Sequence, residues 1–175
     1  MMRYLGILLS VFIFTSCIDS SGTVGPQGPA GPAGPAGPIG QAFEVEADFT
    51  EGNGYSQIFE MPSSVEIFTS DIVVVYLLWE VDGNTGNDVW QQLPVSVFFN
   101  DGQLQYAFDH TVADVKLFLT GDTDLSTVGD GYTLDQIFRV VVLPAEYVQE
   151  NDLDMSNMEE VMSAVKKGEI QRITL

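Results

Sequence analysis

The sequence predicts a mainly β protein, with an antiparallel β-sandwich or jelly-roll-like head that carries one C-terminal helix. Residues 43–175 contain about eight short apolar stretches separated by turn signals, which is typical of two packed antiparallel sheets. One stretch near the end of the chain has helical periodicity instead. Three segments precede the head: a signal peptide over 1–16, a tether over 17–24 and a polyproline-II-like Gly-X-Y tract over 25–42.

Glycine occupies every third position of residues 25–42, in the triplets GPQ, GPA, GPA, GPA, GPI and GQA. Such a collagen-like repeat allows three polyproline-II chains to pack around one axis, because no side chain fits at the centre. At a rise of about 3.1 Å per residue the tract would extend for about 55 Å. Two interpretations stay open, a single-chain semi-rigid spacer and a triple helix that makes the protein a homotrimer.

The first residues of the chain have the features of an export signal. One positive charge, Arg3, precedes an apolar run over 5–14, which is too short to span a bilayer but suits a secretory signal. The run leads into FTSC, where the small residues before Cys17 resemble the lipobox of bacterial lipoproteins. That resemblance implies cleavage before Cys17, attachment of diacylglycerol to its sulfur and a stable lipid anchor.

The residue after the cysteine indicates an address within the envelope. Ile18 stands there rather than aspartate, and in lipoproteins of this type an aspartate would favour retention in the inner membrane. The resemblance therefore implies the outer membrane, through the lipid at Cys17. Whether the head faces the periplasm or the cell surface is left open.

Composition excludes several classes of function. The chain has 25 Asp and Glu against 6 Lys and Arg. Without Arg3 of the signal peptide, five basic residues remain against 25 acidic ones, a formal charge of −20. Such a charge repels phosphate backbones, so we expect no nucleic-acid partner. Cys17 is the single cysteine, which excludes an intrachain disulfide and a cysteine-rich metal site.

The first half of the head shows three strand patterns. Apolar and acidic residues alternate over 43–49, as in a half-buried strand. A turn over 51–54 separates this strand from a second one over 55–61, which Pro62 ends. The stretch 72–81 is the most apolar of the head on both alternating faces, so it should be a central strand.

The middle of the head contains the clearest hairpin. A polar loop over 82–88 leads to Val89 and Trp90, and Leu93-Pro94 then marks the start or edge of a strand. Strands over 95–99 and 103–110 flank Asn-Asp-Gly, and Asp-Gly supplies the positive φ angles of a tight primed turn. The alternation places three apolar residues of the second strand on one face: Leu104, Tyr106 and Phe108.

The last third adds two strands, a helix and an edge strand. Strands are expected over 115–119 and 137–143, joined by a long loop over 121–131. A capping box from Ser156 to Glu159, with lysines near the end, predicts one helix over about 157–167. Its apolar face should lie on the sheet and consists of Met158, Val161, Met162 and Val165. Residues 170–175 are expected to form an edge strand.

Two parts of the head also suggest a family. The first runs from DVW at 88 to FLT at 120 and includes FDHT at 108–111, and the second is FRVVVLPA at 138–145. With the anchor and the repeat, they are similar to small collagen-like lipoproteins of Gram-negative bacteria that have a C-terminal β-rich domain. The resemblance covers nearly the whole chain and implies an architecture of anchor, spacer and head. It implies no activity and no catalytic residues.

Catalytic chemistry has little support in the sequence. The sole histidine, His110, continues the apolar face of its strand, which favours a packed or strand-end role over that of a general base. No motif supports a serine triad, and paired carboxylates cannot be identified among so many acids. Arg139 lies within an apolar strand, so it should reach the surface or form an ion pair with one of the carboxylates.

We therefore expect no cofactor and no catalytic residues, and one metal remains to be considered. Calcium requires several oxygen ligands from a flexible loop. Two sets of polar side chains could supply them, although both sets are also ordinary turn residues. These are Asp122, Asp124 and Asp130 in one loop, and Asp82, Asn84 and Asp88 in another.

These observations predict a lipid-anchored cell-envelope protein that displays a noncatalytic β-sandwich for adhesion, recognition or envelope structure. The ligand would be an unidentified envelope or extracellular component. Two alternatives remain. One is a trimer-forming head like those of C1q and tumour necrosis factor, which also follow collagen stalks. The other is a carboxylate-based carbohydrate-active enzyme, which would need a cleft with two opposed carboxylates.

Overall fold

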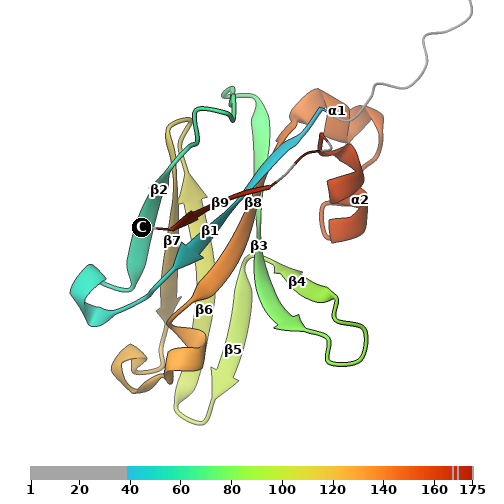
Figure 1. The fold of residues 1–175 in the computed structure, drawn as a ribbon. Coiled ribbons are helices and arrows are strands. Elements are labelled where there is room, and N and C mark those ends of the chain that lie inside the picture. The colour runs from blue at the N-terminus through green and yellow to red at the C-terminus, as the bar shows by residue number, and fades with distance from the viewer. Residues whose placement is uncertain (1–38, 167, 169, 175) are drawn as a thin grey trace, which may run out of the picture. The chain divides into compact units, whose positions relative to one another are not determined.

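The computed structural model describes residues 39–166, 168 and 170–174. Within these residues nine strands form two sheets that pack face to face (Figure 1), which confirms the predicted β-sandwich. The signal peptide, the tether, Cys17 and most of the Gly-X-Y tract lie outside the described residues. Those assignments therefore stay predictions.

The five-stranded sheet has the order β4-β3-β8-β1-β9. Neighbouring strands are antiparallel except for β1 and β9, which run parallel. The stretch expected to be central is β3, which pairs with β4 on one side and with β8 on the other. The strands are β1 (Gln41–Ala47), β3 (Asp71–Val81), β4 (Asp88–Gln92), β8 (Gln136–Pro144) and β9 (Gln171–Thr174).

The four-stranded sheet is antiparallel throughout and has the order β2-β7-β6-β5. Strands β5 and β6 form the predicted hairpin. Because the chain passes from β4 in one sheet to β5 in the other at Leu93-Pro94, the predicted strand boundary there is confirmed. The strands are β2 (Ser56–Glu60), β5 (Val95–Phe99), β6 (Gly102–His110) and β7 (Asp114–Gly121).

The hairpin turn differs from the predicted one. Phe99 pairs with Gly102, so Asn100 and Asp101 are the two central residues, and neither has a positive φ. The expected primed turn with Asp101 at positive φ is therefore wrong. Gly102 has a φ of 153°, and a Cβ there would lie 2.7 Å from the backbone nitrogen of Thr123. Glycine is required at this position by the close approach of the neighbouring chain.

The core lies between the two sheets and follows the alternation seen in the sequence. Residues of β1, β3 and β8 on one side meet residues of β2, β5, β6 and β7 on the other. Completely buried members include Phe43, Val45, Val75, Leu104, Tyr106, Leu117, Phe138 and Val140. At about 25 cal/mol per Å² of apolar surface, this layer is the main source of stability of the head.

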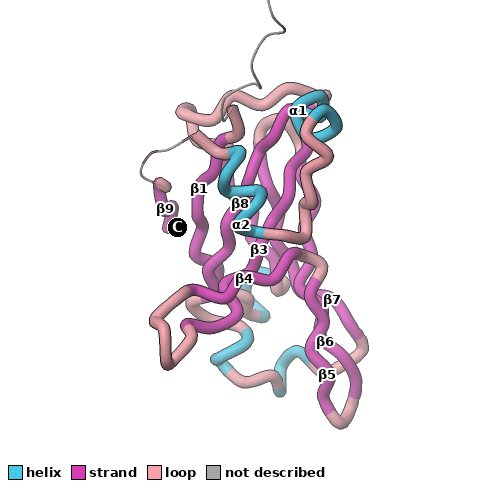
Figure 2. The backbone as a smooth tube through the Cα atoms, turned by 90° about the vertical axis from the view of Figure 1, so that its right-hand side faces the viewer, coloured by secondary structure: helices cyan, strands magenta, loops and turns pink. Residues whose placement is uncertain are grey.

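Two helices cover part of the outer face of the five-stranded sheet, beside β3 and β8 (Figures 1 and 2). α2 (Met158–Ala164) is the predicted helix, and α1 (Ala145–Glu150) directly after β8 was not predicted. The N-cap of α2 is Asn157 rather than Ser156, because the Asn157 side chain accepts hydrogen bonds from the next turn. Val165 follows the helix and bridges to Gly40 instead of extending it.

The first strand begins inside the stretch that the sequence assigned to the repeat. β1 starts at Gln41, two positions before the predicted start of the head at Phe43. Gly40, the last glycine of the repeat, donates its N–H to Ala164 O (2.9 Å) and is buried. A Cβ at Gly40 would overlap the Leu143 side chain, so the glycine also serves the packing of the head. The last triplet of the predicted repeat, residues 40–42, is therefore part of the packed head.

Candidate functional site: an aromatic cleft at one end of the sandwich

The described residues form an open cavity of about 390 Å³, which is larger than two others of about 200 and 230 Å³. It lies at the end of the sandwich where the β3–β4 hairpin, which is at the lower right in Figure 1, diverges from the four-stranded sheet. Its lining comes from β3, β6, the start of β8 and the short 3₁₀ helix η3 (Asp130–Tyr132). The lining residues, which we call the aromatic cleft, are Leu77, Leu78, Trp79, Tyr106, Gly131, Tyr132 and Gln136.

The strand lengths explain why the sandwich opens at this end. The pairing of β3 with β8 ends at Leu77 and Phe138, whereas its pairing with β4 continues to Val81. The β3–β4 hairpin therefore projects beyond β8. A β-bulge between Leu78 and Glu80 leaves Trp79 without a partner on β4. Because a bulge bends a strand and re-aims a side chain, this irregularity places the indole at the edge of the cavity.

Tyr132 lies in η3, on the other side of the cavity from Trp79, and two residues of the four-stranded sheet contact it. The hydroxyl of the buried Tyr106 donates to Tyr132 O (2.7 Å). Burial raises the pKa of Tyr106, with a smaller contribution from Tyr132, so its hydroxyl stays protonated and remains a donor. The ring of Phe99 meets the Tyr132 ring edge to face, with centroids 5.3 Å apart.

Gln136 links the start of β8 to the segment that contains Tyr132. Its side-chain Nε2 donates to Gly131 O (3.2 Å) and to Leu134 O (2.6 Å). Both amide hydrogens are thereby used within the protein, while Oε1 remains an acceptor. The backbone of the segment that presents Tyr132 is thus fixed by hydrogen bonds from two directions.

The cleft presents aromatic surface to solvent without a charged side chain in its lining. Trp79 is 39% exposed and Tyr132 is 37% exposed, although both adjoin the packed core. Neither an acid nor a base is found among the described residues that line the cavity. Acidic residues flank the lining in sequence instead, at Glu80, Asp130 and Asp135. Chemically, this arrangement can bind a ligand through ring faces.

Apart from the aromatic cleft, the head has a cluster of charged side chains on the outer face of the five-stranded sheet. Its carboxylate, Glu44, forms ion pairs with two arginines. Nε and Nη2 of Arg139 donate to Glu44 Oε1 (3.1 and 2.6 Å), and the same atoms of Arg172 donate to Oε2 (2.9 and 2.6 Å). Burial opposes ionisation of Glu44, but these hydrogen bonds and charges outweigh it and lower the pKa of the carboxyl. The predicted ion pair of Arg139 is confirmed.

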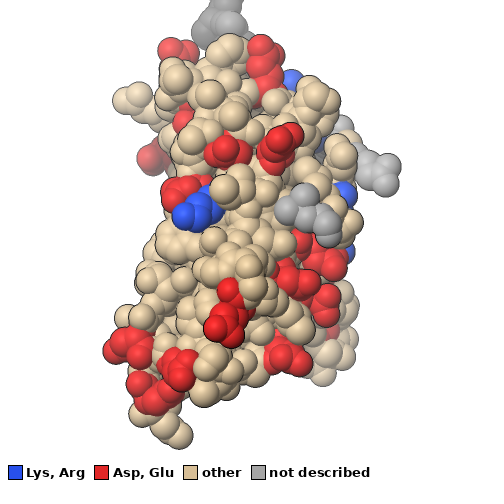
Figure 3. Space-filling view, turned by 90° about the vertical axis from the view of Figure 1, so that its left-hand side faces the viewer, with Lys and Arg blue, Asp and Glu red and all other residues tan. Residues whose placement is uncertain are grey.

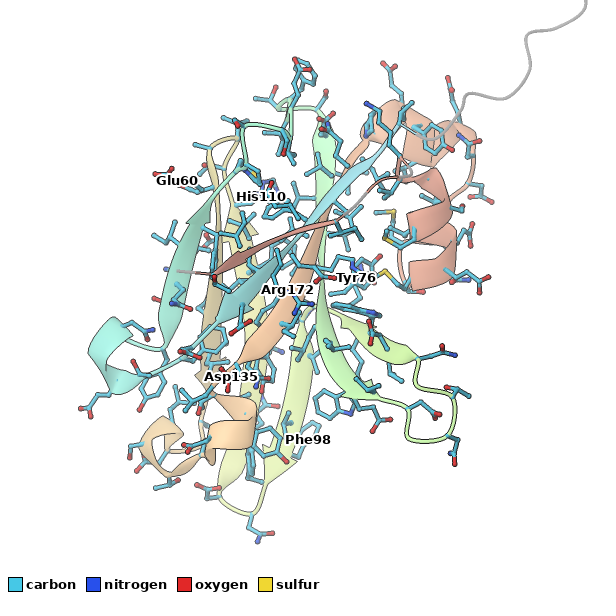
Figure 4. All side chains as sticks on the ribbon, viewed as in Figure 1. Glu60, Tyr76, Phe98, His110, Asp135 and Arg172 are labelled. Carbon is cyan, nitrogen blue, oxygen red and sulfur yellow. The ribbon has the colours of Figure 1, made fainter. Side chains whose placement is uncertain are left out.

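The guanidinium of Arg139 also stacks on an aromatic ring. Its Cζ lies 4.0 Å from the centre of the Trp90 ring on β4. Because Arg172 comes from β9, the cluster connects the parallel edge strand to β1 and β8 (Figure 4). Every polar atom of these side chains that is buried has a partner, so the cluster is structural.

His110 lies at the end of β6 and is exposed, as the sequence predicted for a strand-end residue. Its ring stacks on Phe108, with centroids 6.4 Å apart and an interplanar angle of 20°. Figure 4 shows His110 toward the end of the sandwich opposite to Asp135 and Phe98. The histidine is therefore remote from the aromatic cleft.

The carboxylates considered for calcium serve their own loops. Asp122 Oδ1 accepts from the N–H of Gln103 (2.6 Å). Asp124 Oδ1 accepts from the N–H (3.0 Å) and hydroxyl (2.7 Å) of Ser126, and these bonds lower its pKa. Asp130 begins η3. Over residues 39–166, 168 and 170–174, the structure contains no group of three or more His, Cys, Asp or Glu suited to a metal ion.

The loop between β3 and β4 is organised in the same way. Asp82 Oδ1 accepts from the N–H of Thr85 (2.7 Å) and of Asn84 (3.0 Å), and also from the Thr85 hydroxyl (2.9 Å). These bonds lower the pKa of Asp82. Asn84 therefore takes part in the turn through its backbone N–H, which donates to Asp82. Calcium binding at either loop stays an alternative to ordinary turns, and nothing in the structure tests it.

Sequence reasoning did not identify the two exposed aromatic residues of the cleft, Trp79 and Tyr132. Trp79 was assigned to the central strand, and Tyr132 followed a loop considered only for its acids. One signal pointed to Trp79: the apolar stretch over 72–81 is longer than the 137–143 stretch beside which it packs, so its end has to project beyond the partner. Nothing in the local pattern places Tyr132 opposite Trp79.

Comparison with known proteins gives no counterpart from which a function could be transferred. No protein-family model matches the chain, and neither does a curated protein or a solved structure. Within the part of the chain that the structure describes, none of the helices has the length and apolar character needed to cross a membrane.

Proposed function

We propose that the chain is a lipid-anchored protein of the bacterial cell envelope whose head is a noncatalytic binding module. In this proposal the acylated Cys17 attaches the protein to the outer membrane, and the Gly-X-Y tract acts as a spacer. The β-sandwich then recognises an envelope or extracellular ligand. The single observation that carries the binding function is the aromatic cleft, with the exposed rings of Trp79 and Tyr132 held in place by the surrounding chain.

The anchor is supported by the order of the segments. A short apolar run is followed directly by FTSC, and Cys17 is the single cysteine of the chain. The acidic head favours a covalent lipid over electrostatic membrane binding, since an anionic surface would repel it. Figure 3 shows acidic side chains distributed over one face of the head, with few basic ones among them.

The lining of the aromatic cleft is suited to binding and does not supply the carboxyl pair of a glycosidase. A glycosidase needs two carboxyl groups separated by roughly 5–10 Å across the ligand. No Asp or Glu is among the described residues that line the cavity, and His110 lies at the other end of the sandwich. The groups of the cleft are suited to contact a ligand and hold it.

The anchor can be tested by metabolic labelling with an alkyne-bearing palmitate in a Gram-negative host. We compare the full chain with Cys17→Ala, and the proposal expects label on the wild type only. Membrane fractionation should place the labelled protein in the outer membrane. An unlabelled wild-type protein, or one recovered in the soluble fraction, would contradict the anchor.

A second arm of that experiment addresses the exposed leaflet. Protease added to intact cells degrades a surface-exposed head and spares a periplasmic one until the outer membrane is opened. Both outcomes are compatible with the anchor, and they decide whether the ligand is extracellular or belongs to the envelope. Neither arm depends on which ligand the cleft binds.

A further inference from the structure

We propose that the aromatic cleft binds an organic cation, an alkylated ammonium or a guanidinium group, against the rings of Trp79 and Tyr132. This inference rests on the proposed binding function and names the chemical class of the ligand. Three observations carry it: the exposed rings, the distribution of charge around them, and the way in which the same chain already uses its aromatic residues.

Trp79 and Tyr132 line the cavity with exposed aromatic rings, and the face of such a ring carries the negative part of its π-system. Cations within about 6 Å of such a ring centre are attracted, and Trp is the strongest of the aromatic side chains in this respect. Trp79 and Tyr132 are 39% and 37% exposed, although both adjoin a packed core. The volume of about 390 Å³ is enough for a group the size of a side chain or a small ammonium compound.

Charge around the cleft excludes anions and favours cations. The head, residues 43–175, carries five basic residues against 24 acidic ones. Among the described residues, no Lys or Arg lines the cavity, so a carboxylate or phosphate ligand would find no partner there. Glu80, Asp130 and Asp135 adjoin lining residues in sequence. Their field, together with the net charge, draws a cation to this end of the sandwich.

The chain already pairs cations with aromatic rings elsewhere. The Arg139 guanidinium lies 4.0 Å from the centre of the Trp90 ring, and Lys116 Nζ lies 5.4 Å from that of Phe118. No such cation is found at Trp79 or Tyr132 within the described part of the chain. The cleft therefore has the aromatic half of this interaction, and a ligand would supply the other half.

A neutral sugar is the main competing ligand, because it also stacks on aromatic rings. Sugar recognition relies on several directed hydrogen bonds to hydroxyl groups. In the cleft, both amide hydrogens of Gln136 are used by Gly131 O and Leu134 O, and the Tyr106 hydroxyl is used by Tyr132 O. The remaining side-chain donors of the lining are the indole N–H of Trp79 and the hydroxyl of Tyr132, whereas a cation on a ring face needs no donor.

The test compares each cation with an uncharged molecule of the same shape. Choline is paired with 3,3-dimethylbutan-1-ol, and N-acetyl-argininamide is paired with N-acetyl-citrullinamide. The full chain is purified in a polyoxyethylene detergent, which contains neither a sugar nor an ammonium group. Saturation-transfer NMR on the probe molecules gives the affinity of each without depending on the fluorescence of the protein.

The proposal expects at least one cation to bind saturably and about 5- to 30-fold more tightly than its uncharged counterpart. Raising the ionic strength from about 0.01 to about 1 M, which shortens the Debye length from ~30 to ~3 Å, should weaken that binding several-fold. Binding of N-acetyl-argininamide alone would point to a partner protein as the source of the cation. Binding of choline alone would point to a small ammonium compound or a lipid headgroup.

Variants locate the binding site. Trp79→Ala and Tyr132→Ala should each weaken cation binding roughly 5- to 30-fold. Phe98→Ala is the matched control, because Phe98 is 78% exposed on the neighbouring β5 but does not line the cavity, and it should bind as the wild type does. A cooperative thermal transition of each variant verifies its fold, and Trp79→Phe provides a milder change at the same position.

Several results would overturn the inference. One is equal binding of a cation and its uncharged counterpart, which would make the cleft a simple apolar groove. Another is salt-independent binding of cellotetraose that Trp79→Ala abolishes, which would preserve the binding function and change the ligand class to a sugar. Cation binding that both cleft variants retain, or no saturable cation binding, would also overturn it. The lipid-labelling experiment is independent of all these results.

Discussion

The two tryptophans of the chain lie on the two strands of one hairpin but differ in their surroundings. Trp90 on β4 pairs with Leu78, is half-buried against α2 and its neighbours, and has the Arg139 guanidinium on its ring. Trp79 on β3 lies in the bulge, has no partner on β4 and is exposed in the aromatic cleft. A shift of one residue in the pairing of two strands thus separates a packed indole from an exposed one.

This difference shows how one hairpin can serve stability and recognition at once. On the outer face of the sheet, Arg139 forms an ion pair with Glu44 and stacks on the ring of Trp90. At the open end of the sandwich, the ring of Trp79 lacks such partners among the described residues. We expect substitutions on the Trp90 side to lower stability and those on the Trp79 side to affect binding.

The largest expected effect comes from removing the carboxylate that organises the Trp90 side. Glu44→Ala leaves Arg139, whose side chain is only 14% exposed, without its counter-ion. Breaking a buried ion pair costs about 3–5 kcal/mol, and the partial exposure of Arg172 reduces this figure, so we expect a loss of about 2–4 kcal/mol. Urea unfolding of the full chain in detergent measures the change in unfolding free energy.

Glu46→Ala is the matched control for that substitution. Glu46 lies two positions along β1 on the same face and has no ion pair within the described residues. Its loss should change stability by less than about 0.5 kcal/mol. Equal effects of the two substitutions would mean that the cluster contributes nothing specific.

The next largest loss of stability is expected for one of the two tryptophans and not for the other. Trp90→Ala removes half-buried ring surface and the contact with Arg139, and we expect a loss of about 2 kcal/mol. Trp79→Ala removes an exposed ring and should cost less than about 1 kcal/mol. Thermal unfolding of both variants tests this order, and the reverse order would remove the distinction between the two sides of the hairpin.

A smaller loss of stability is expected when the hydrogen bond between Tyr106 and the backbone of Tyr132 is removed. Tyr106→Phe keeps the buried ring and removes the hydroxyl that donates to Tyr132 O. We expect a loss of about 1 kcal/mol, because the carbonyl is left without this partner. Hydrogen exchange should show faster opening of η3, and unchanged exchange there would mean that the bond does not hold Tyr132.

The last prediction concerns the pH dependence of the Glu44 cluster. The pKa of Glu44 is lowered below its ordinary value of 4.5, so its ionised form stabilises the folded state above that pH. This contribution is lost as the pH falls through the folded-state pKa. The stability difference between wild type and Glu44→Gln should therefore be constant above pH 4.5 and shrink below it. A difference that grows on acidification would contradict the assignment.

Much of the sandwich follows from local patterns in the sequence. Alternation over 43–49 and 103–110 correctly gave the buried faces of β1 and β6, because a strand has a period of two. The six-residue helix α1 was missed, since it is too short to show periodicity and begins directly after Pro144. The cap of α2 was misplaced by one residue because Ser156 and Asn157 are both good N-caps.

The candidate site depended on information that local patterns do not contain. Arg139 was expected to find a carboxylate, but its identity as Glu44 follows from the pairing of β1 with β8 across the sheet. The cleft depends on where β8 starts relative to β3, on the bulge at Trp79, and on η3 folding back toward them. These features join segments about 50 residues apart, so a scan of neighbouring residues cannot reveal them.

The most direct test of the distinction between the two tryptophans observes each of them separately during binding. The full chain labelled with 5-fluorotryptophan gives two ¹⁹F signals, which Trp79→Phe and Trp90→Phe assign. On titration with choline or N-acetyl-argininamide, we predict that the Trp79 signal shifts saturably and that the Trp90 signal stays in place. A shift confined to Trp90, or equal shifts of both signals, would contradict the account.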